Sequence, residues 1–135
     1  MMSAAEISFR LADLCKAAAS AALDAQIALG NSNDSGTVLL RDRLRRQVLS
    51  LTETATELRT QALLDATQVM SADLARMDAV IAQAEADIAA IRKANQLLTR
   101  IGQILAVGLA VVTLATQPGP GNAKALVEAI EALAA

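Results

Sequence analysis

The feature that most constrains this chain is a span of 65 residues, from Thr37 to Ile101, that contains neither glycine nor proline. Because these two residues are the strongest helix breakers, their absence over such a length predicts continuous helix. Helices in globular domains are seldom this long, whereas coiled-coil helices commonly are. The sequence therefore predicts an all-α protein organised around one very long helix.

Apolar residues recur within this span at alternating spacings of three and four, the pattern of a coiled-coil seam. Between Ala62 and Leu74 the spacing changes to steps of four, which shifts the seam. Ser71 is also suited to cap the start of a new helix. Residues 37–116 are therefore predicted as one long helix, or as two helices with a break near 70–71. The seam residues are Val48, Leu51, Ala55, Leu58 and Ala62, and then Leu74, Met77, Ile81, Ala84, Ile88, Ile91, Asn95 and Leu98.

Turn-forming residues divide the rest of the chain, in the sequence GNSNDSG before the long span and QPGPG after it. Ser3 and Asn122 are good N-cap residues for the two flanking helices. The predicted fold is a long antiparallel helical hairpin, or coiled-coil bundle, in a single domain. The predicted elements are a helix at 3–29, a loop at 30–36, the long segment at 37–116, a turn at 117–121 and a short amphipathic helix at 122–134.

The composition argues against catalysis. Hydrophobic residues make up 54% of the chain and aromatic residues only 1%, and there is one cysteine and no histidine. The commonest general base and the usual metal ligands are therefore missing, so we expect no enzyme activity, metal, cofactor or small-molecule substrate. A net charge of −2 also lacks the basic footprint of a nucleic-acid-binding protein, so nucleic acid is not an expected partner.

The remaining reactive groups, a thiol and a pair of carboxylates, are predicted to have no catalytic role. Cys15 is surrounded on its helix by Leu14 and Ala18, which predicts a buried, unreactive thiol. Glu53 and Glu57 lie one turn apart, but the histidines that accompany such acids in metal-binding helical bundles are missing. These two carboxylates are therefore predicted to belong to a solvated helix surface.

A dense basic patch lies at the start of the long segment, where four of six residues are arginine: Arg41, Arg43, Arg45 and Arg46. Guanidinium groups bind carboxylates and phosphates through paired hydrogen bonds, so the patch is a candidate docking site for an acidic partner or another anion. Its position at a helix N-terminus, where cations oppose the helix dipole, favours such a role. The alternative is a solvated face in which Asp42 pairs with Arg45 or Arg46.

Residues 101–116 form an uncharged apolar segment, IGQILAVGLAVVTLAT. Small residues at spacings of four, as at Gly102, Ala106 and Ala110, predict a close approach to a neighbouring helix. Arginine and lysine precede the segment, as they do on the cytoplasmic side of membrane helices. Its unbroken apolar core is short for a membrane span, which favours burial in protein over lipid. The candidate packing or membrane residues are Gly102, Ile104, Leu105, Ala106, Leu109, Ala110 and Val112.

Asn95 occupies a position of the otherwise apolar seam. A polar residue there often fixes the register or oligomeric state of a coiled coil by bonding to its counterpart. The alternative is an exposed asparagine near a helix kink. Both interpretations remain open from the sequence.

These features favour a non-catalytic module for protein–protein interaction, such as a bacterial adaptor, chaperone or immunity-type protein. An alanine-rich seam buries little apolar area per residue, so a protein partner or a second copy, as in a homo-oligomer, is expected to supply the rest. The alternative is a membrane-associated protein, either a pore-forming subunit or a single-span anchor, that inserts residues 101–116.

The predicted location is the bacterial cytoplasm. Glu6 and Asp13 stand where a classical signal peptide would be basic and then apolar. An excess of arginine over lysine, together with abundant alanine, is typical of bacteria with GC-rich genomes. Membrane association, or export without a classical signal, is the alternative.

Overall fold

The structure is a computed structural model, and it describes residues 3–61 and 71–135. Helices and their connections account for these residues, and no strand is present in the two described ranges. The predicted all-α fold is thus confirmed. The helices are α1 (Ala4–Ala28), α2 (Ser35–Thr60), α3 (Ser71–Ala90), α4 (Ala94–Thr116) and α5 (Pro120–Ala134).

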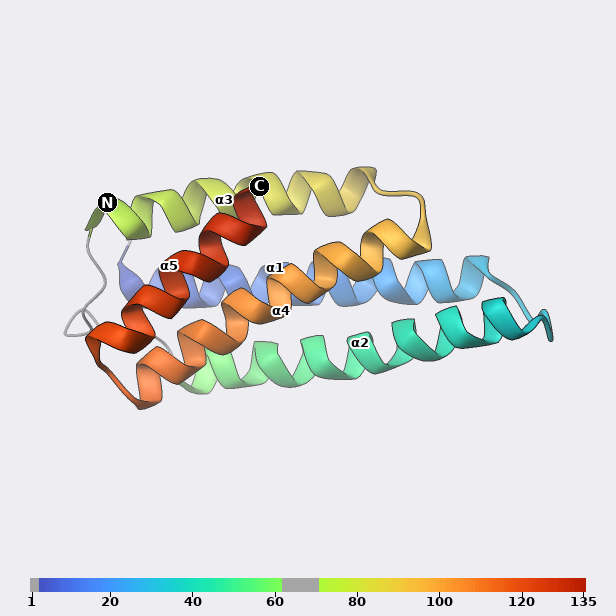
Figure 1. Cartoon of the computed structure of the whole chain (residues 1–135), viewed down its shortest axis with the longest axis horizontal. Helices are drawn as coiled ribbons and strands as arrows, with labels where there is room; N and C mark the ends of the chain where they lie inside the picture. The colour runs from blue at the N-terminus through green and yellow to red at the C-terminus, as the bar shows by residue number, and fades with distance from the viewer. Residues whose placement is uncertain (1–2, 62–70) are drawn as a thin grey trace.

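α1 and α2 form an antiparallel hairpin, α3 and α4 pack against it, and α5 packs on α3 and α4 (Figure 1). The ends of α1 follow the sequence closely. Ser3 Oγ accepts a hydrogen bond of 3.2 Å from the Glu6 backbone N–H, which caps the N-terminus. Gly30 follows the C-terminus with a φ of +69°, a left-handed conformation that glycine adopts without strain. Asp34 then caps α2, so that α2 begins at Ser35, two residues before the predicted start.

α1 packs against three helices, α2, α3 and α4. Heptad positions such as Ile7, Leu11 and Leu14 account for only part of its buried surface, since residues on the neighbouring faces are buried as well. Most of the additional residues are alanine, whose small side chain lets three helices approach α1 closely. The buried residues of α1 are Ala4, Ile7, Ser8, Leu11, Ala12, Leu14, Cys15, Ala18, Ala19 and Ala22.

The uninterrupted helix predicted over residues 37–116 is wrong, whereas the alternative, a new helix that starts near Ser71, agrees with the start of α3. α2 ends at Thr60 and α3 begins at Ser71, while Ala62 and Met70, on which the predicted seam and break depended, lie outside the described residues. A second interruption, which the sequence analysis did not anticipate, separates α3 from α4 at residues 91–93. The segment therefore contributes α2, α3 and α4.

The interruption at residues 91–93 needs no glycine or proline because tertiary packing outweighs the lost helical hydrogen bonds. Lys93 is extended, with φ −93° and ψ 129°, and it gives α4 no side-chain cap. The chain reverses there (Figure 1), which returns α4 across α1 and α2. An uninterrupted rod would leave the apolar stripe of α4 in water. The buried residues of that stripe are Leu97, Ile101, Ile104, Val107, Gly108, Val111 and Leu114.

The Pro-Gly turn brings α5 back onto α4 and α3, and α5 buries Leu126, Ile130 and Leu133. The predicted start of this helix is off by two residues. Pro120 occupies the first turn, where its missing N–H leaves no bond unmade. Asn122 does not cap the helix, and its side-chain amide instead donates to the Gln117 carbonyl at 2.7 Å.

Candidate functional site: the exposed side of the helical hairpin

The arginines of the basic patch do not act as one free cluster. Arg45 and Arg46 both pair with Asp42 on the same helix, with 3.0 Å between Arg45 Nη2 and Asp42 Oδ1. The hydrogen bond from Arg46 is the largest cause that lowers the pKa of Asp42. Arg41 is used elsewhere, since it donates to two carbonyl oxygens of the loop between α1 and α2, at 2.6 Å to Gly30 and 2.8 Å to Ser32.

The helix dipole also has little effect on the arginines of the patch. α2 begins at Ser35, so Arg41 lies beyond the first turn, where the effect of the helix dipole has largely fallen away. Arg43 is exposed and faces a shallow hollow that also includes Leu98 and Thr99 of α4. The arrangement therefore resembles the solvated-face alternative, with two arginines sharing one carboxylate.

The apolar segment divides between core and surface. Ile104 is buried, and Leu105, Ala110 and Val112 are partly buried against the core. Gly102, Ala106 and Leu109 are exposed, and a Cβ atom added to Gly102 would meet no atom within 4 Å. The small-residue stripe therefore does not make the predicted close contact. Its Ala106 and Ala110 instead line a hollow of about 300 Å³ between α4 and α5.

The close helix contact is made by Gly108, on another face of α4. A Cβ atom on Gly108 would lie 2.6 Å from Cγ2 of Thr54 and 3.8 Å from Cδ1 of Leu58. The first distance is well below van der Waals contact, so glycine at this position allows α4 to lie against α2. Heptad spacing alone does not distinguish Gly108 from Gly102.

In the part of the chain that the structure describes, α4 is the helix whose length and apolar composition would suffice for a membrane span. Core helices of soluble proteins have the same properties, and 39% of the apolar window of α4 is buried within the protein.

Asn95 does not lie in a seam. It is exposed in the first turn of α4, just after the interruption at residues 91–93, and its carbonyl accepts a hydrogen bond from Thr99 Oγ1 at 3.1 Å. The predicted role in register required a continuous helix through this position, and α3 ends at Ala90. The exposed asparagine near a break in the helix is the arrangement observed.

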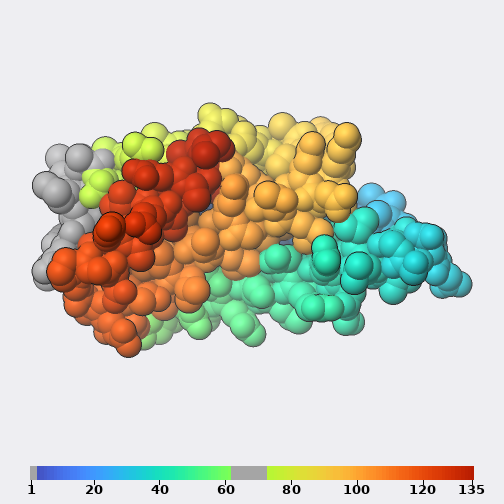
Figure 2. All heavy atoms as spheres, in the orientation of Figure 1, coloured from blue at the N-terminus to red at the C-terminus, as the bar shows by residue number. Residues whose placement is uncertain are grey.

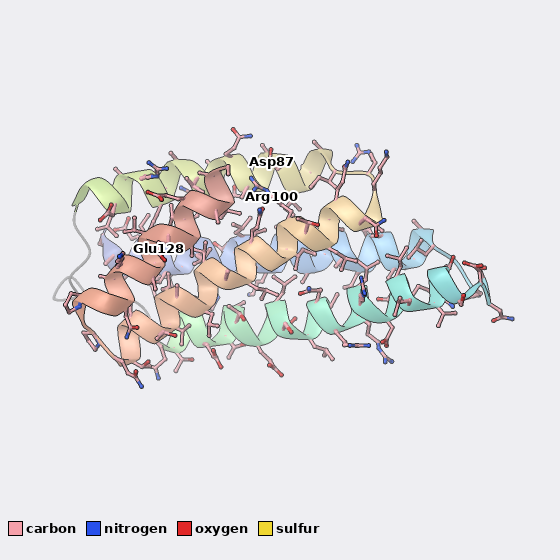
Figure 3. All side chains as sticks on the ribbon, in the orientation of Figure 1. Asp87, Arg100 and Glu128 are labelled. Atoms are coloured by element: carbon pink, nitrogen blue, oxygen red, sulfur yellow. The ribbon has the colours of Figure 1, made fainter. Side chains whose placement is uncertain are left out.

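Arg100 links three helices, a role that the sequence analysis missed. Its guanidinium donates to Asp87 Oδ2 of α3 at 2.5 Å and to the Leu133 carbonyl of α5 at 2.6 Å. It also bonds Gln103 Oε1 at 2.8 Å, and its side chain is only 12% exposed. Figure 3 shows Asp87 and Arg100 side by side where these helices meet, with Glu128 further along α5. The pair joins α4 to α3, and both side chains also line an open hollow of about 470 Å³ beside the turn between these helices.

Metal-ligating side chains do not gather in the described ranges. No cluster of three or more histidine, cysteine or acidic residues occurs there. Glu53 and Glu57 are exposed, as predicted. Cys15 is buried, and burial raises the pKa of its thiol to about 12.

The state of Cys15 leads to a simple prediction. Since its pKa lies far above 8, almost none of the folded protein carries a thiolate at pH 8, and burial also blocks access. We expect a thiol reagent to modify Cys15 slowly in buffer and rapidly once denaturant unfolds the chain. Mass spectrometry of timed reactions measures this, and equal rates in the two conditions would contradict a buried thiol.

The most distinctive surface is the exposed side of the hairpin. Seven large apolar side chains are exposed among the described residues, and all but Leu109 lie on α1 and α2. Ile27 is 76% exposed and Leu49 is 61% exposed. Figure 2 shows that the end of the hairpin projects beyond the turn between α3 and α4, so no other helix covers it. The six hairpin residues are Phe9, Leu23, Ile27, Val38, Leu39 and Leu49.

One side of α2 is exposed along its length except at Asp42, which is partly buried, and its residues recur at spacings of three and four. We call this set the outer face of α2. Its threonines carry hydroxyls that bond within the helix, for example Thr52 Oγ1 to the Val48 carbonyl at 2.8 Å and Thr56 Oγ1 to the Thr52 carbonyl at 3.1 Å. Because the hydroxyl hydrogens are bonded within the helix, these threonines have no free donor, and the face is less polar than its sequence indicates. The outer face consists of Val38, Asp42, Arg45, Arg46, Leu49, Thr52, Glu53 and Thr56.

Beside the hairpin, a groove of about 440 Å³ runs between α1 and the turn that joins α3 to α4. Its floor is apolar and includes Ala21 and Ile88, while Asp24, Glu85 and Lys93 contribute charges of both signs. The groove offers apolar contact and complementary charge rather than reactive chemistry.

Comparison of the chain with family models, with curated proteins and with solved structures gives no match.

Proposed function

We propose that this chain is a non-catalytic helical module that binds another protein chain through the exposed side of its α1–α2 hairpin. The observation that carries the proposal is the gathering of six of the seven large exposed apolar side chains on those two helices. Contiguous apolar surface is unfavourable in water, and on a folded domain it commonly marks a site of protein interaction.

The packing of the rest of the bundle supports this interpretation. Most of the large apolar residues of α4 and α5 are buried, so the described chain does build a core. The exposed apolar residues are therefore concentrated on the two helices of the hairpin and are not a sign of loose packing throughout. Arginines on the same helix add charge that can select among partners.

The alternative proposal is a membrane-associated protein that inserts α4, and the apolar composition of that helix supports it. Insertion would remove α4 from its contacts with α1 and α2. It would also separate Arg100 from Asp87 and from the Leu133 carbonyl. Because breaking such charged hydrogen bonds is unfavourable, we favour the interaction module.

Site-specific photocross-linking tests the proposed function. A photoreactive side chain at Leu39, which is half exposed on the hairpin, is expected to yield a discrete protein adduct in cells that make the chain. The same group at Ala79, on the exposed side of α3, serves as the control and is expected to yield none. Equal labelling at the two positions, or no discrete adduct at Leu39, would refute the proposed interaction surface.

A further inference from the structure

We infer that the outer face of α2 binds the same face of a second copy of this chain, with the two helices antiparallel and related by a twofold axis at Leu49. This inference rests on the proposed function, because it names the partner for part of the hairpin surface. Three observations support it: the placement of the charges, the position of Leu49 and the character of the threonines.

The charges on the outer face are incompletely paired within one chain. Arg45 and Arg46 share the single carboxylate of Asp42, which leaves one positive charge uncompensated. Glu53 is exposed on the same face, and no ion pair joins it to another side chain of the described ranges. Arg46 and Glu53 are seven residues, or two helical turns, apart, a separation of about 10 Å that prevents a direct contact within the helix.

An antiparallel copy brings these two charges together. With the axis at Leu49, Arg46 lies three residues to one side, and Glu53 of the second copy lies four residues to the same side. The offset along the helix is therefore about 1.5 Å. The symmetry repeats the pair, so two ion pairs flank the centre. A parallel arrangement would instead place Arg46 beside Arg46 and Glu53 beside Glu53, which like-charge repulsion disfavours.

Leu49 supplies the apolar centre of this arrangement. At 61% exposure it is among the most exposed large apolar residues described, and the twofold axis places it against its own copy. Thr52 and Thr56 extend the apolar strip, because their hydroxyls already bond to backbone carbonyls. A single helix face buries a small area, so the expected dimer is weak, with a micromolar dissociation constant.

Disulfide trapping tests the geometry in the full chain. Cys15 is buried, so the native background contributes no accessible thiol from the described residues. Leu49→Cys places two thiols at the twofold axis. Val38→Cys, on the same face, places them about 33 Å apart, because each lies eleven residues from the axis. We expect Leu49→Cys to form a covalent dimer at least about tenfold faster than Val38→Cys under mild oxidation, owing to its higher effective concentration.

A charge exchange tests the pairing independently. Arg46→Glu or Glu53→Arg alone is expected to weaken the dimer about tenfold in sedimentation equilibrium, and the double exchange is expected to restore it. Arg43→Glu, at an exposed position of α2 outside the outer face, is the matched control and should leave the affinity unchanged. Thermal unfolding of each variant distinguishes a lost contact from a lost fold.

The outcomes separate this inference from the proposed function. A monomer at millimolar concentration, equal trapping rates for the two cysteine variants, or no recovery in the double exchange would overturn the antiparallel dimer. If the photocross-linker at Leu39 then still captures a different protein, only the dimer is wrong. If it captures nothing, the proposed function fails as well. An adduct of twice the chain mass of 14.0 kDa, together with rapid trapping of Leu49→Cys, supports both.

Discussion

Replacement of Arg100 by methionine is expected to lower the free energy of unfolding by about 2 to 3 kcal/mol, because hydrogen bonds to charged groups contribute about 1.5 to 3 kcal/mol and unpaired buried partners add to the loss. Methionine keeps the length of the side chain but loses the bonds to Asp87, Gln103 and the Leu133 carbonyl. Since these bonds join α4 to α3 and α5, α5 should also become easier to open. Denaturant unfolding and amide hydrogen exchange measure the two effects.

Arg43→Met is the matched control, since Arg43 is exposed and forms no ion pair with the described residues. Its effect should stay within about 0.5 kcal/mol, as for most surface substitutions. A similar loss in both variants would show that methionine itself, rather than the missing bonds, destabilises the chain.

Asp87, the partner of Arg100, also makes the free energy of unfolding depend on pH in a direction that can be predicted. The hydrogen bond from Gln83 is the largest cause that lowers the pKa of Asp87 below 3.8, and Arg100 lowers it further. A carboxyl group whose pKa is lower in the folded state stabilises the fold above its unfolded pKa and loses that contribution as the pH falls through the folded value. Asp87→Asn should therefore reduce the loss of stability on acidification below about pH 4.

Local signals predicted the fold wherever the physical cause is local. Ser3 caps α1 and Gly30 ends it, because capping and positive φ depend on residues close in sequence. The apolar spacing of α2 and α3 also predicts buried residues such as Leu51 and Met77. Helix formation and the choice of core face were accessible for the same reason.

Features that depend on distant contacts were not predictable in this way. The break at residues 91–93 lacks any breaker residue and exists because α4 gains burial by folding back onto α1 and α2. Asn95 lost its predicted seam position for the same reason. The link between Arg100 and the Leu133 carbonyl joins residues 33 positions apart, a separation that periodicity does not report.

The candidate site was only partly accessible from the sequence. The arginines of α2 stand out by their density, but their pairing with Asp42 and with the loop carbonyls requires coordinates. Leu49 looks like any other leucine of a helix. Its exposure nevertheless follows from the predicted seam, because Leu51 and Leu58 of that seam face the core. The interaction surface is thus defined by which apolar residues remain unburied.

Alanine substitution at the two glycines of α4 is expected to change the free energy of unfolding in opposite directions. Gly102→Ala is expected to raise the free energy of unfolding by about 0.5 to 1 kcal/mol, because alanine favours the helix and its Cβ meets no atom within 4 Å. Gly108→Ala should lower it, since a Cβ there lies 2.6 Å from Thr54 Cγ2 and overpacking typically costs about 1 to 3 kcal/mol. Denaturant unfolding of the two variants measures the difference.

A second substitution tests whether the steric contact with Thr54 causes the loss of stability in Gly108→Ala. Thr54→Ser deletes the Cγ2 methyl group that a Cβ at Gly108 would meet, so the double variant Thr54→Ser and Gly108→Ala should recover most of the stability lost by Gly108→Ala. Thr54→Ser combined with Gly102→Ala should show no such coupling, because Gly102 faces open space. Additive effects in both double variants would mean that position 108 of α4 does not lie against Thr54 of α2. That result would contradict the close packing of α4 on the hairpin at Gly108.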